Sequence, residues 1–107
     1  MPKRDLWDAP YWDSVRTFRE FTKGYVYFVQ GEISRHIKIG YTSKEPKVRL
    51  CQLQVGSSEK LHLLGAFWGN EDVEQFTQAK WRKNRIHGEW FEESPELLEF
   101  IKKESNA

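Results

Sequence analysis

Cysteine is almost absent from this chain, with Cys51 the single one among 107 residues. One thiol excludes an intramolecular disulfide and a multi-cysteine zinc site, and the three histidines show no zinc-ligand spacing with it. The chain therefore suits a reducing compartment. Because the neighbours of Cys51 in the sequence are apolar, we expect a buried and inert thiol; they are Val48, Leu50 and Leu53.

Long apolar runs are also missing. No stretch approaches the roughly 20 apolar residues that a membrane-spanning helix needs. The N-terminal residues, Met1-Pro2-Lys3-Arg4-Asp5, lead into no apolar segment of the kind found in signal peptides. The sequence therefore predicts no membrane span and a cytoplasmic location.

An excess of charge of one sign is missing too, because 17 Lys and Arg residues against 16 Asp and Glu residues leave a net charge of +1. This balance argues against a protein that coats nucleic acid non-specifically. The basic residues are nevertheless clustered, and such clusters could bind phosphate, although a solvated helix surface gives the same pattern. The nucleic-acid-binding candidates are Arg35, Lys44, Lys47, Lys80, Arg82, Lys83 and Arg85.

Aromatic residues, in contrast, are abundant: they make up 15% of the chain and include five Trp. A chain of this length buries roughly two-thirds of its unfolded surface in one modest core, which large rings fill efficiently. We therefore expect one domain over residues 24–104, preceded by an N-terminal arm and short helix over residues 1–23. Aromatic residues of the arm could meet a protein partner; they are Trp7, Tyr11 and Trp12.

Hydrophobic patterning predicts the order strand, strand, helix, strand, helix, short strand, helix. The first two strands form an antiparallel hairpin, the third is a central strand and the second helix is the longest. The predicted strands are 24–30, 35–41, 60–68 and 89–91, and the predicted helices are 45–54, 71–85 and the segment from residue 95 onward. This order is typical of an α+β fold with a mostly antiparallel sheet.

Two serines mark predicted helix starts. Ser43 is expected to cap the helix that begins near Pro46, and Ser94 is expected to cap the last helix, because each stands before a proline suited to the first helical turn. In the first of these helices we expect Val48 and Cys51 to face inward, and the choice between Leu50 and Leu53 stays open.

Four motifs carry the polar groups that phosphodiester cleavage uses. The first strand holds Tyr27, the second holds Lys38, the following helix holds Arg49, and the Gly88-Glu89-Trp90-Phe91 segment holds Glu89. Hydrolysis needs a nucleophile in line with the bond, charge stabilisation on the non-bridging oxygens and help for the leaving oxygen. One carboxylate with waters can hold Mg²⁺. Glu89 is therefore the candidate metal ligand.

Each of the other groups has a role that suits its chemistry. Tyr27 would orient or deprotonate the attacking water, and Arg49 would grip the scissile phosphate. Lys38 would contact the phosphate or the leaving group. The secondary candidates are Tyr25, Tyr41 and His87. Tyr25 shares a strand face with Tyr27, whereas Tyr41 is an odd number of residues from Lys38 and is expected to point to the opposite face. His87 stands beside the glutamate motif.

These motifs resemble those of the GIY-YIG endonuclease superfamily, and look closest to its compact phage and bacterial branch. Tyr25-Val26-Tyr27 is similar to the first eponymous motif, and Lys38-Ile39-Gly40 is similar to the second. Arg49 and Glu89 match the arginine and glutamate of the family. The resemblance spans about residues 24–101. It implies a nuclease dependent on Mg²⁺ or Mn²⁺, built on a three-stranded antiparallel sheet flanked by helices.

The sequence departs from the family pattern at several positions. Tyr25 stands where the first motif has Gly, and Lys38 stands where most of the superfamily has Tyr. The branch often has a His four residues after a glutamate in the long helix; here Glu74 is followed by Gln78. No residue matches the downstream Asn of the family, because Asn106 lies close to the C-terminus.

The sequence thus predicts a divalent-metal DNA endonuclease acting on duplex or branched DNA. So small a chain shows no base-reading element, so we expect weak sequence specificity, homodimerisation to cut both strands, or recognition of a DNA structure. Two alternatives stay open. One is a catalytically impaired module that binds nucleic acid or a host protein, and the other is an interaction protein unrelated to nucleic acid.

Overall fold

The computed structural model describes residues 24–106, so the arm and helix predicted for residues 1–23 lie outside the described residues. The elements in chain order are β1 (Tyr25–Gly31), β2 (Ile37–Thr42), α3 (Pro46–Val55), β3 (Leu61–Trp68), α4 (Glu71–Lys80), the 3₁₀ helix η1 (Arg82–Asn84), β4 (Arg85–His87), β5 (Trp90–Phe91) and α5 (Pro95–Glu104).

The strands form a single antiparallel sheet in the order β3-β1-β2-β5-β4. The α+β class and the β1–β2 hairpin are confirmed. The expected three-stranded sheet is wrong, because β4 and β5 extend it to five strands. β5 (two residues) falls within the short strand predicted for residues 89–91, whereas β4 (three residues) was not predicted, because it is too short for an alternating pattern to show in the sequence.

β3 lies at an edge of the sheet, so its predicted central position is also wrong. Its apolar composition reflects burial against helices on both faces rather than a strand on both sides. The chain just after α5 covers part of the free edge: the backbone N–H of Asn106 donates to the carbonyl of Ala66 (2.9 Å), and its side-chain oxygen accepts from the N–H of Trp68 (3.3 Å).

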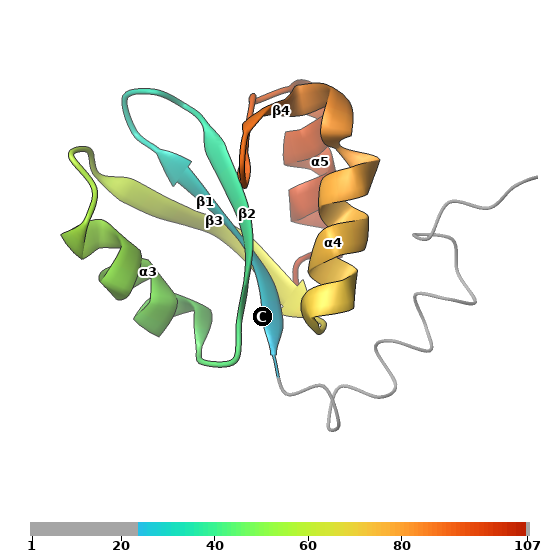
Figure 1. The fold of residues 1–107 in the computed structure, drawn as a ribbon, viewed down its shortest axis with the longest axis horizontal. Coiled ribbons are helices and arrows are strands. Elements are labelled where there is room, and N and C mark those ends of the chain that lie inside the picture. The colour runs from blue at the N-terminus through green and yellow to red at the C-terminus, as the bar shows by residue number, and fades with distance from the viewer. Residues whose placement is uncertain (1–23, 107) are drawn as a thin grey trace, which may run out of the picture.

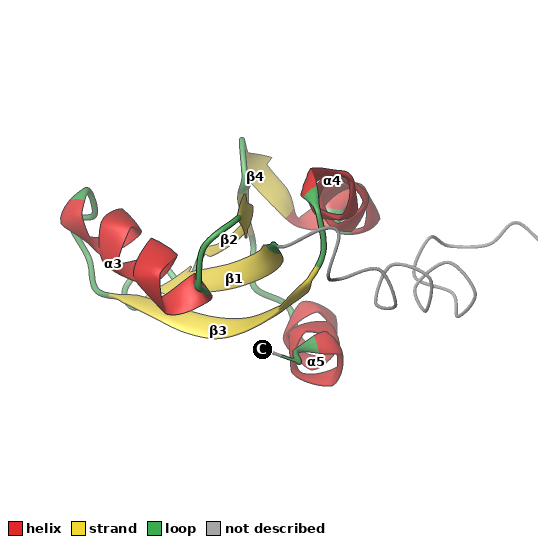
Figure 2. Ribbon diagram, turned by 90° about the horizontal axis from the view of Figure 1, so that it is seen from below, coloured by secondary structure: helices red, strands yellow, loops and turns green. Residues whose placement is uncertain are grey.

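Helices cover the two faces of the sheet unequally. α3 lies on one face, and α4 and α5 lie on the other side (Figures 1 and 2). Alternation along β1 supplies both interfaces, because Val26 and Phe28 belong to the core under α4 and α5, whereas Tyr27 and Val29 belong to the cluster under α3. The α3 face is therefore the one that carries Tyr27.

α3 differs from its prediction at its start and on its inner face. Pro46 occupies the first helical turn, which makes Glu45 the N-cap residue, and no side chain caps the helix; the expected Ser43 cap is wrong because Ser43 stands two residues too early. Val48 and Cys51 are exposed rather than buried. Apolar residues occur all around this helix, so periodicity alone cannot select its inner side. The side chains that pack inward are Leu50 and Leu53.

α4 begins as its sequence suggests but ends early. The Asn70 side chain accepts a hydrogen bond from the N–H of Val73 (3.0 Å) and caps the first turn. The predicted helix over 71–85 is wrong in its last five residues, since α4 ends at Lys80 and residues 85–87 form β4. Pairing with β5 in the folded chain outweighs the helical pattern there.

α5 confirms its prediction. Ser94 accepts a hydrogen bond from the N–H of Leu97 (3.1 Å), Pro95 opens the helix, and Leu97 and Ile101 are buried in the core. The capping serine, the proline and the apolar spacing all act locally, which explains why the sequence suffices to place this element.

A carboxylate from the α3–β3 connection holds the turn between β1 and β2. Glu59 accepts hydrogen bonds from the backbone N–H groups of Ile33 (2.7 Å) and Ser34 (2.9 Å) and from the Ser34 hydroxyl (2.8 Å). The hydrogen bonds from Ser34, followed by that from Ile33, hold the pKa of Glu59 below its ordinary value of 4.5. Folding therefore favours the ionised carboxylate.

The Glu59 contacts predict a pH-dependent contribution to stability. Because the folded-state pKa of Glu59 is depressed, its contribution is fully present above the unfolded value of 4.5 and is lost as pH falls through the folded value. Glu59→Gln should lower the free energy of unfolding at neutral pH, and its difference from the wild type should shrink in acid. Urea unfolding across a pH series measures this, with the exposed Glu99→Gln as control. A difference that does not change with pH would contradict the assignment.

Candidate functional site

Tyr27 lies at the centre of the α3 face. It stands between two small residues, opposite Gly40 on β2 and Ala66 on β3, and is 2% exposed. The phenol lies so close to Gly40 that a Cβ there would overlap the hydroxyl and the end of the ring. Gly40 therefore makes the space that the Tyr27 phenol occupies.

The carboxylate of the last motif is placed by a tight turn between β4 and β5. Gly88 has a φ of +55°, in the left-handed region that favours glycine. The next residue, Glu89, accepts a hydrogen bond from the N–H of Ile39 through its backbone carbonyl (2.9 Å). The turn residue Gly88 and the β2 contact together hold the Glu89 backbone beside β2.

Lys38 and Glu89 form an ion pair, with 2.9 Å between Nζ and Oε1. The Lys38 side chain is 15% exposed and that of Glu89 is 44% exposed, so the carboxylate stays open to solvent while the ammonium is largely covered. Lys38 Nζ also lies 5.7 Å from the centre of the Trp90 ring. The motifs predict both charged residues, but no pattern in the sequence indicates their direct contact.

Arg49 lies half-buried on α3. Its guanidinium donates to Gln52 Oε1 (3.2 Å), and both residues line a shallow hollow of about 270 Å³ with Tyr41, Thr42, Ser43 and Lys44. Arg49 is thus placed near the end of β2 rather than beside Glu89.

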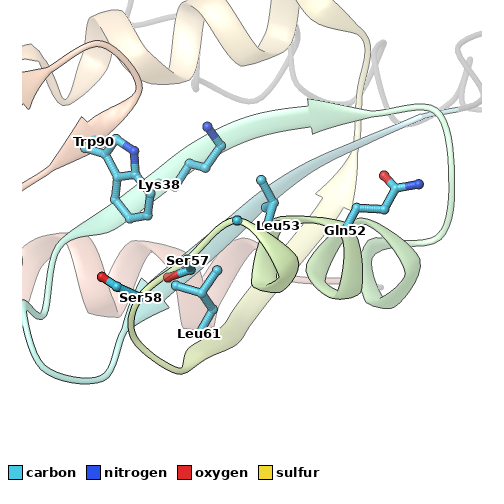
Figure 3. Close-up of a pocket in the computed structure, with 8 residues that line it drawn as sticks. Lys38, Gln52, Leu53, Ser57, Ser58, Leu61 and Trp90 are labelled. Carbon is cyan, nitrogen blue, oxygen red and sulfur yellow. The ribbon is translucent and has the colours of Figure 1, made fainter.

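A second hollow, of about 470 Å³, lies further along α3 (Figure 3). Its lining includes Lys38 and Trp90 on the sheet side and Gln52 on the helix side. Because Gln52 borders both hollows, they follow one another along α3, with Arg49 toward one end and Lys38 toward the other. The α3 face therefore carries one elongated surface with a cation at each end.

Glu74 on α4 is close enough to the ion pair to feel it electrostatically. Burial raises the pKa of Glu74 above its ordinary value of 4.5, the charges of Glu89 and Glu71 raise it further, and Lys38 and a hydrogen bond from the Tyr41 N–H lower it. Glu74 belongs to the helix pattern of the GIY-YIG resemblance, but the motifs do not predict it as a site residue. Glu74 and Gln78 are four residues apart and so lie on one helix face. This spacing is the sequence signal that could have indicated Glu74.

Gln78, which stands where the resemblance to GIY-YIG endonucleases predicts a histidine, makes hydrogen bonds through both ends of its amide. Its amide nitrogen donates to the carbonyl of Ile39 (2.8 Å), and its oxygen accepts from the guanidinium of Arg85 (3.0 Å). β2 pairs with β5 over two residues only, and beyond that pairing side chains of α4 bond to its backbone: Gln78 to the carbonyl of Ile39 and Glu74 to the N–H of Tyr41. These two side chains therefore complete the sheet edge from the α4 side.

The three secondary candidates fall in different places. Tyr25 is half-buried on the face of Tyr27 and packs against the same cluster. Tyr41 pairs with Val26, so alternation directs it away from the Lys38 face, and its ring lies against Gly24. His87 is exposed on β4. Of these, Tyr25 is the one that shares the site face.

The basic candidates do not form one surface. Lys44 lines the hollow that contains Arg49, and Lys47 is exposed on the first turn of α3. Arg35 lies at the opposite end of β2 and pairs with Glu93 (3.2 Å).

The basic candidates of residues 80–85 lie away from α3. Lys80 Nζ is placed over the rings of Trp81 and Phe100, at 5.8 and 5.7 Å, on the α4–α5 side. Arg85 lies over the Phe91 ring at 5.4 Å, while Arg82 and Lys83 are exposed on η1. Of the basic candidates, Lys44 and Lys47 are therefore the ones adjacent to Arg49.

The donor set fits a hard divalent cation held by few protein ligands. Within residues 24–106, no group of three or more His, Cys, Asp or Glu side chains could hold a metal, so a closed protein cage is not formed there. Mg²⁺ commonly binds through one or two carboxylates plus waters and substrate phosphates. The solvent-open carboxylate of Glu89, with Lys38 on one oxygen, is compatible with such a site.

Fold and site together define a small α+β domain with a lysine–glutamate pair and a buried tyrosine under one helix. Residues 24–105 match the family model described as the T5orf172 domain, and the chain belongs to this family. No curated protein and no solved structure matches the chain. None of the helices in the described part has the length and apolar content to cross a membrane.

Proposed function

We propose that this protein is a divalent-metal-dependent DNA endonuclease that hydrolyses phosphodiester bonds. The observation that carries the proposal is the 2.9 Å contact between Lys38 and Glu89. Lys38 pairs with Val29 and so shares the sheet face of Tyr27. Arg49 lies on α3, the helix that packs on this face. The similarity of these motifs to those of GIY-YIG endonucleases supports the same chemistry.

Glu89 would hold the Mg²⁺ or Mn²⁺ ion. A bound divalent ion supplies positive charge that stabilises the phosphoryl and leaving oxygens. Glu89 suits this task because its side chain is 44% exposed and its backbone is fixed by the Gly88 turn and by Ile39. The carboxylate direction is therefore set before DNA arrives, which avoids a reorganisation cost during the reaction.

The cations would bind the phosphate backbone. Lys38 donates one of its three N–H groups to Glu89, which leaves further donors for a phosphate oxygen. Arg49 offers a planar guanidinium that can contact two phosphate oxygens at once. Tyr27 would orient the attacking water, or accept its proton, from its fixed position over Gly40.

DNA would approach along the α3 face. Lys44 and Lys47 stand next to Arg49 and provide backbone contacts that carry no sequence information. We propose duplex or branched DNA as substrate and, for cleavage of both strands, a homodimer. We propose the aromatic residues before residue 24 as the contact for a protein partner.

One observation favours the alternative of a binding module without cleavage activity. Gln78 occupies the position of the family histidine, and both ends of its amide are engaged, by Ile39 and Arg85. Its amide group, unlike an imidazole, does not titrate and so cannot act as an acid or a base. If proton transfer at this position is indispensable, the protein binds DNA or a partner without cutting.

Cleavage of supercoiled plasmid tests the proposal directly. We expect nicking with Mg²⁺ or Mn²⁺ and none with EDTA. Arg49→Ala should slow cleavage about 100-fold or more, the range seen when one group that stabilises developing charge is removed. The matched control is Arg82→Ala, an exposed arginine on η1 away from α3, which should cut at nearly the wild-type rate. If the folded protein fails to cut the plasmid in the presence of either Mg²⁺ or Mn²⁺, the result supports the binding module instead.

A further inference from the structure

The larger hollow beside the candidate site has the lining of a nucleobase pocket. It measures about 470 Å³, within the roughly 300–1,000 Å³ typical of small-ligand sites. Apolar surface comes from Leu53, Leu61 and the indole of Trp90, and polar groups come from Lys38 and from the helix end and following loop, namely Gln52, Ser57 and Ser58. This mixture of a ring, aliphatic walls and a few hydrogen-bonding groups suits a flat heteroaromatic ligand.

Trp90 is held rigidly at one wall of the hollow. It pairs with Lys38 on β2 and His87 on β4, and its ring packs partly against the cluster under α3. Figure 3 shows Trp90 and Lys38 across the hollow from the end of α3. An aromatic ring fixed in this way can stack on a base with little loss of side-chain entropy, and such stacking does not depend on base identity.

The position of the hollow couples it to the phosphate-binding groups. Lys38 lines the hollow and contacts Glu89, and Gln52 borders both the hollow and the site of Arg49. A strand whose phosphate lies near Lys38 and Glu89 would therefore have its adjoining base at the mouth of the hollow.

We propose that this hollow binds one unpaired nucleotide, with its base against Trp90 and its phosphate toward Lys38, so that the protein selects DNA containing unpaired bases. The inference rests on the proposed function and specifies its substrate class. A base stacked within a duplex cannot enter the hollow without being extruded, and the free-energy cost of extrusion is least where the base is already unpaired. Flapped or branched DNA is therefore preferred over fully paired duplex.

Fluorescence anisotropy in EDTA tests this preference without cleavage. The probes are a fluorescein-labelled hairpin duplex with a short single-stranded flap and the same hairpin fully paired. The wild type should bind the flapped hairpin about 5- to 100-fold more tightly, the range that stacking of one base on an aromatic ring provides. Trp90→Leu should reduce the ratio to about twofold or less, and Trp90→Phe should keep most of it.

A second pair of variants avoids the partly buried Trp90. Ser58→Leu places a larger, apolar side chain at the rim of the hollow from an exposed position, and Val55→Leu places the same side chain nearby at a residue that is 89% exposed and does not line the hollow. We expect Ser58→Leu to lower the preference for the flap and Val55→Leu to leave it unchanged. Circular dichroism and thermal unfolding confirm that each variant is folded.

The outcomes separate this inference from the proposed function. Equal affinity of the wild type for both hairpins, with cleavage retained, overturns the pocket and leaves the nuclease standing. A preference that survives both Trp90→Leu and Ser58→Leu also overturns the pocket, because recognition then lies elsewhere. Failure to bind either hairpin, together with failure to cut plasmid, overturns both.

Discussion

Glu89→Gln should abolish metal-dependent cleavage while leaving the fold and DNA binding intact. The amide keeps the shape of the side chain, and its oxygen can still accept from Lys38 at the 2.9 Å contact. It lacks the charge that a hard divalent cation requires. Since metal charge stabilisation is worth several kcal/mol, we expect single-turnover cleavage to fall by about 1,000-fold or more.

The affinity of Glu89→Gln for DNA should stay the same or rise, although its cleavage rate falls. Removing a negative charge from a surface that meets phosphates does not weaken binding, and at low salt it should strengthen binding slightly. Anisotropy with a labelled duplex at several salt concentrations measures this. The separation of binding from cleavage distinguishes a lost metal ligand from general damage to the site.

The control for Glu89→Gln is Glu92→Gln, which removes an exposed carboxylate from the chain just after β5. It should cut like the wild type. If Glu89→Gln cuts DNA as fast as Glu92→Gln, the metal is held elsewhere and the proposed role of Glu89 is wrong. If neither the wild type nor any variant cuts, the protein is a binding module, and Glu89→Gln is expected to be nearly silent in every assay.

The elements that the sequence predicted well are those with local causes. The β1–β2 hairpin follows from two β-rich runs, and α5 follows from Ser94, Pro95 and one apolar stripe. The failures have tertiary causes. β4, whose first residue was predicted as the end of a helix, exists because it pairs with β5, and Cys51 lies outward because Leu50 and Leu53 are the side chains of α3 that pack against the sheet.

In the candidate site, too, the residues identified by local motifs were predicted, and the contacts that depend on tertiary packing were not. The motifs identified Tyr27, Lys38, Arg49 and Glu89 as candidates, and the structure brings Lys38 and Glu89 into direct contact. It could not be read from the sequence that Gln78 closes the edge of β2 or that Trp90 forms one wall of a hollow. Both depend on how α4 and β5 lie against β2, which is fixed by packing of the whole domain rather than by spacing along the chain.

Gly40→Ala should damage both stability and activity, because it places a methyl group where the Tyr27 phenol lies. Tyr27 is 2% exposed and held between β2 and β3, so the ring cannot move away without disturbing its neighbours. Overpacking of this kind costs about 1–3 kcal/mol in the free energy of unfolding. Cleavage should fall as well, since the phenol leaves its position over Gly40, from which it would orient the attacking water.

Gly56→Ala is the matched control, because a Cβ at Gly56 meets nothing within 4 Å and its φ of −94° suits any residue. It should leave the free energy of unfolding nearly unchanged or raise it slightly. Urea unfolding of both variants measures the difference. Equal stability of Gly40→Ala and the wild type would mean that the space over Gly40 is not filled by Tyr27.

A double-mutant cycle identifies the cause. Tyr27→Leu removes the ring that the new methyl group would overlap, so combining it with Gly40→Ala should cost less stability than the sum of the single changes, by more than about 0.5 kcal/mol. Tyr27→Phe separates the catalytic role, because it keeps the ring and removes the hydroxyl. If Tyr27→Phe is as stable as the wild type but cuts slowly, the glycine in the second motif is present to place the phenol in the first.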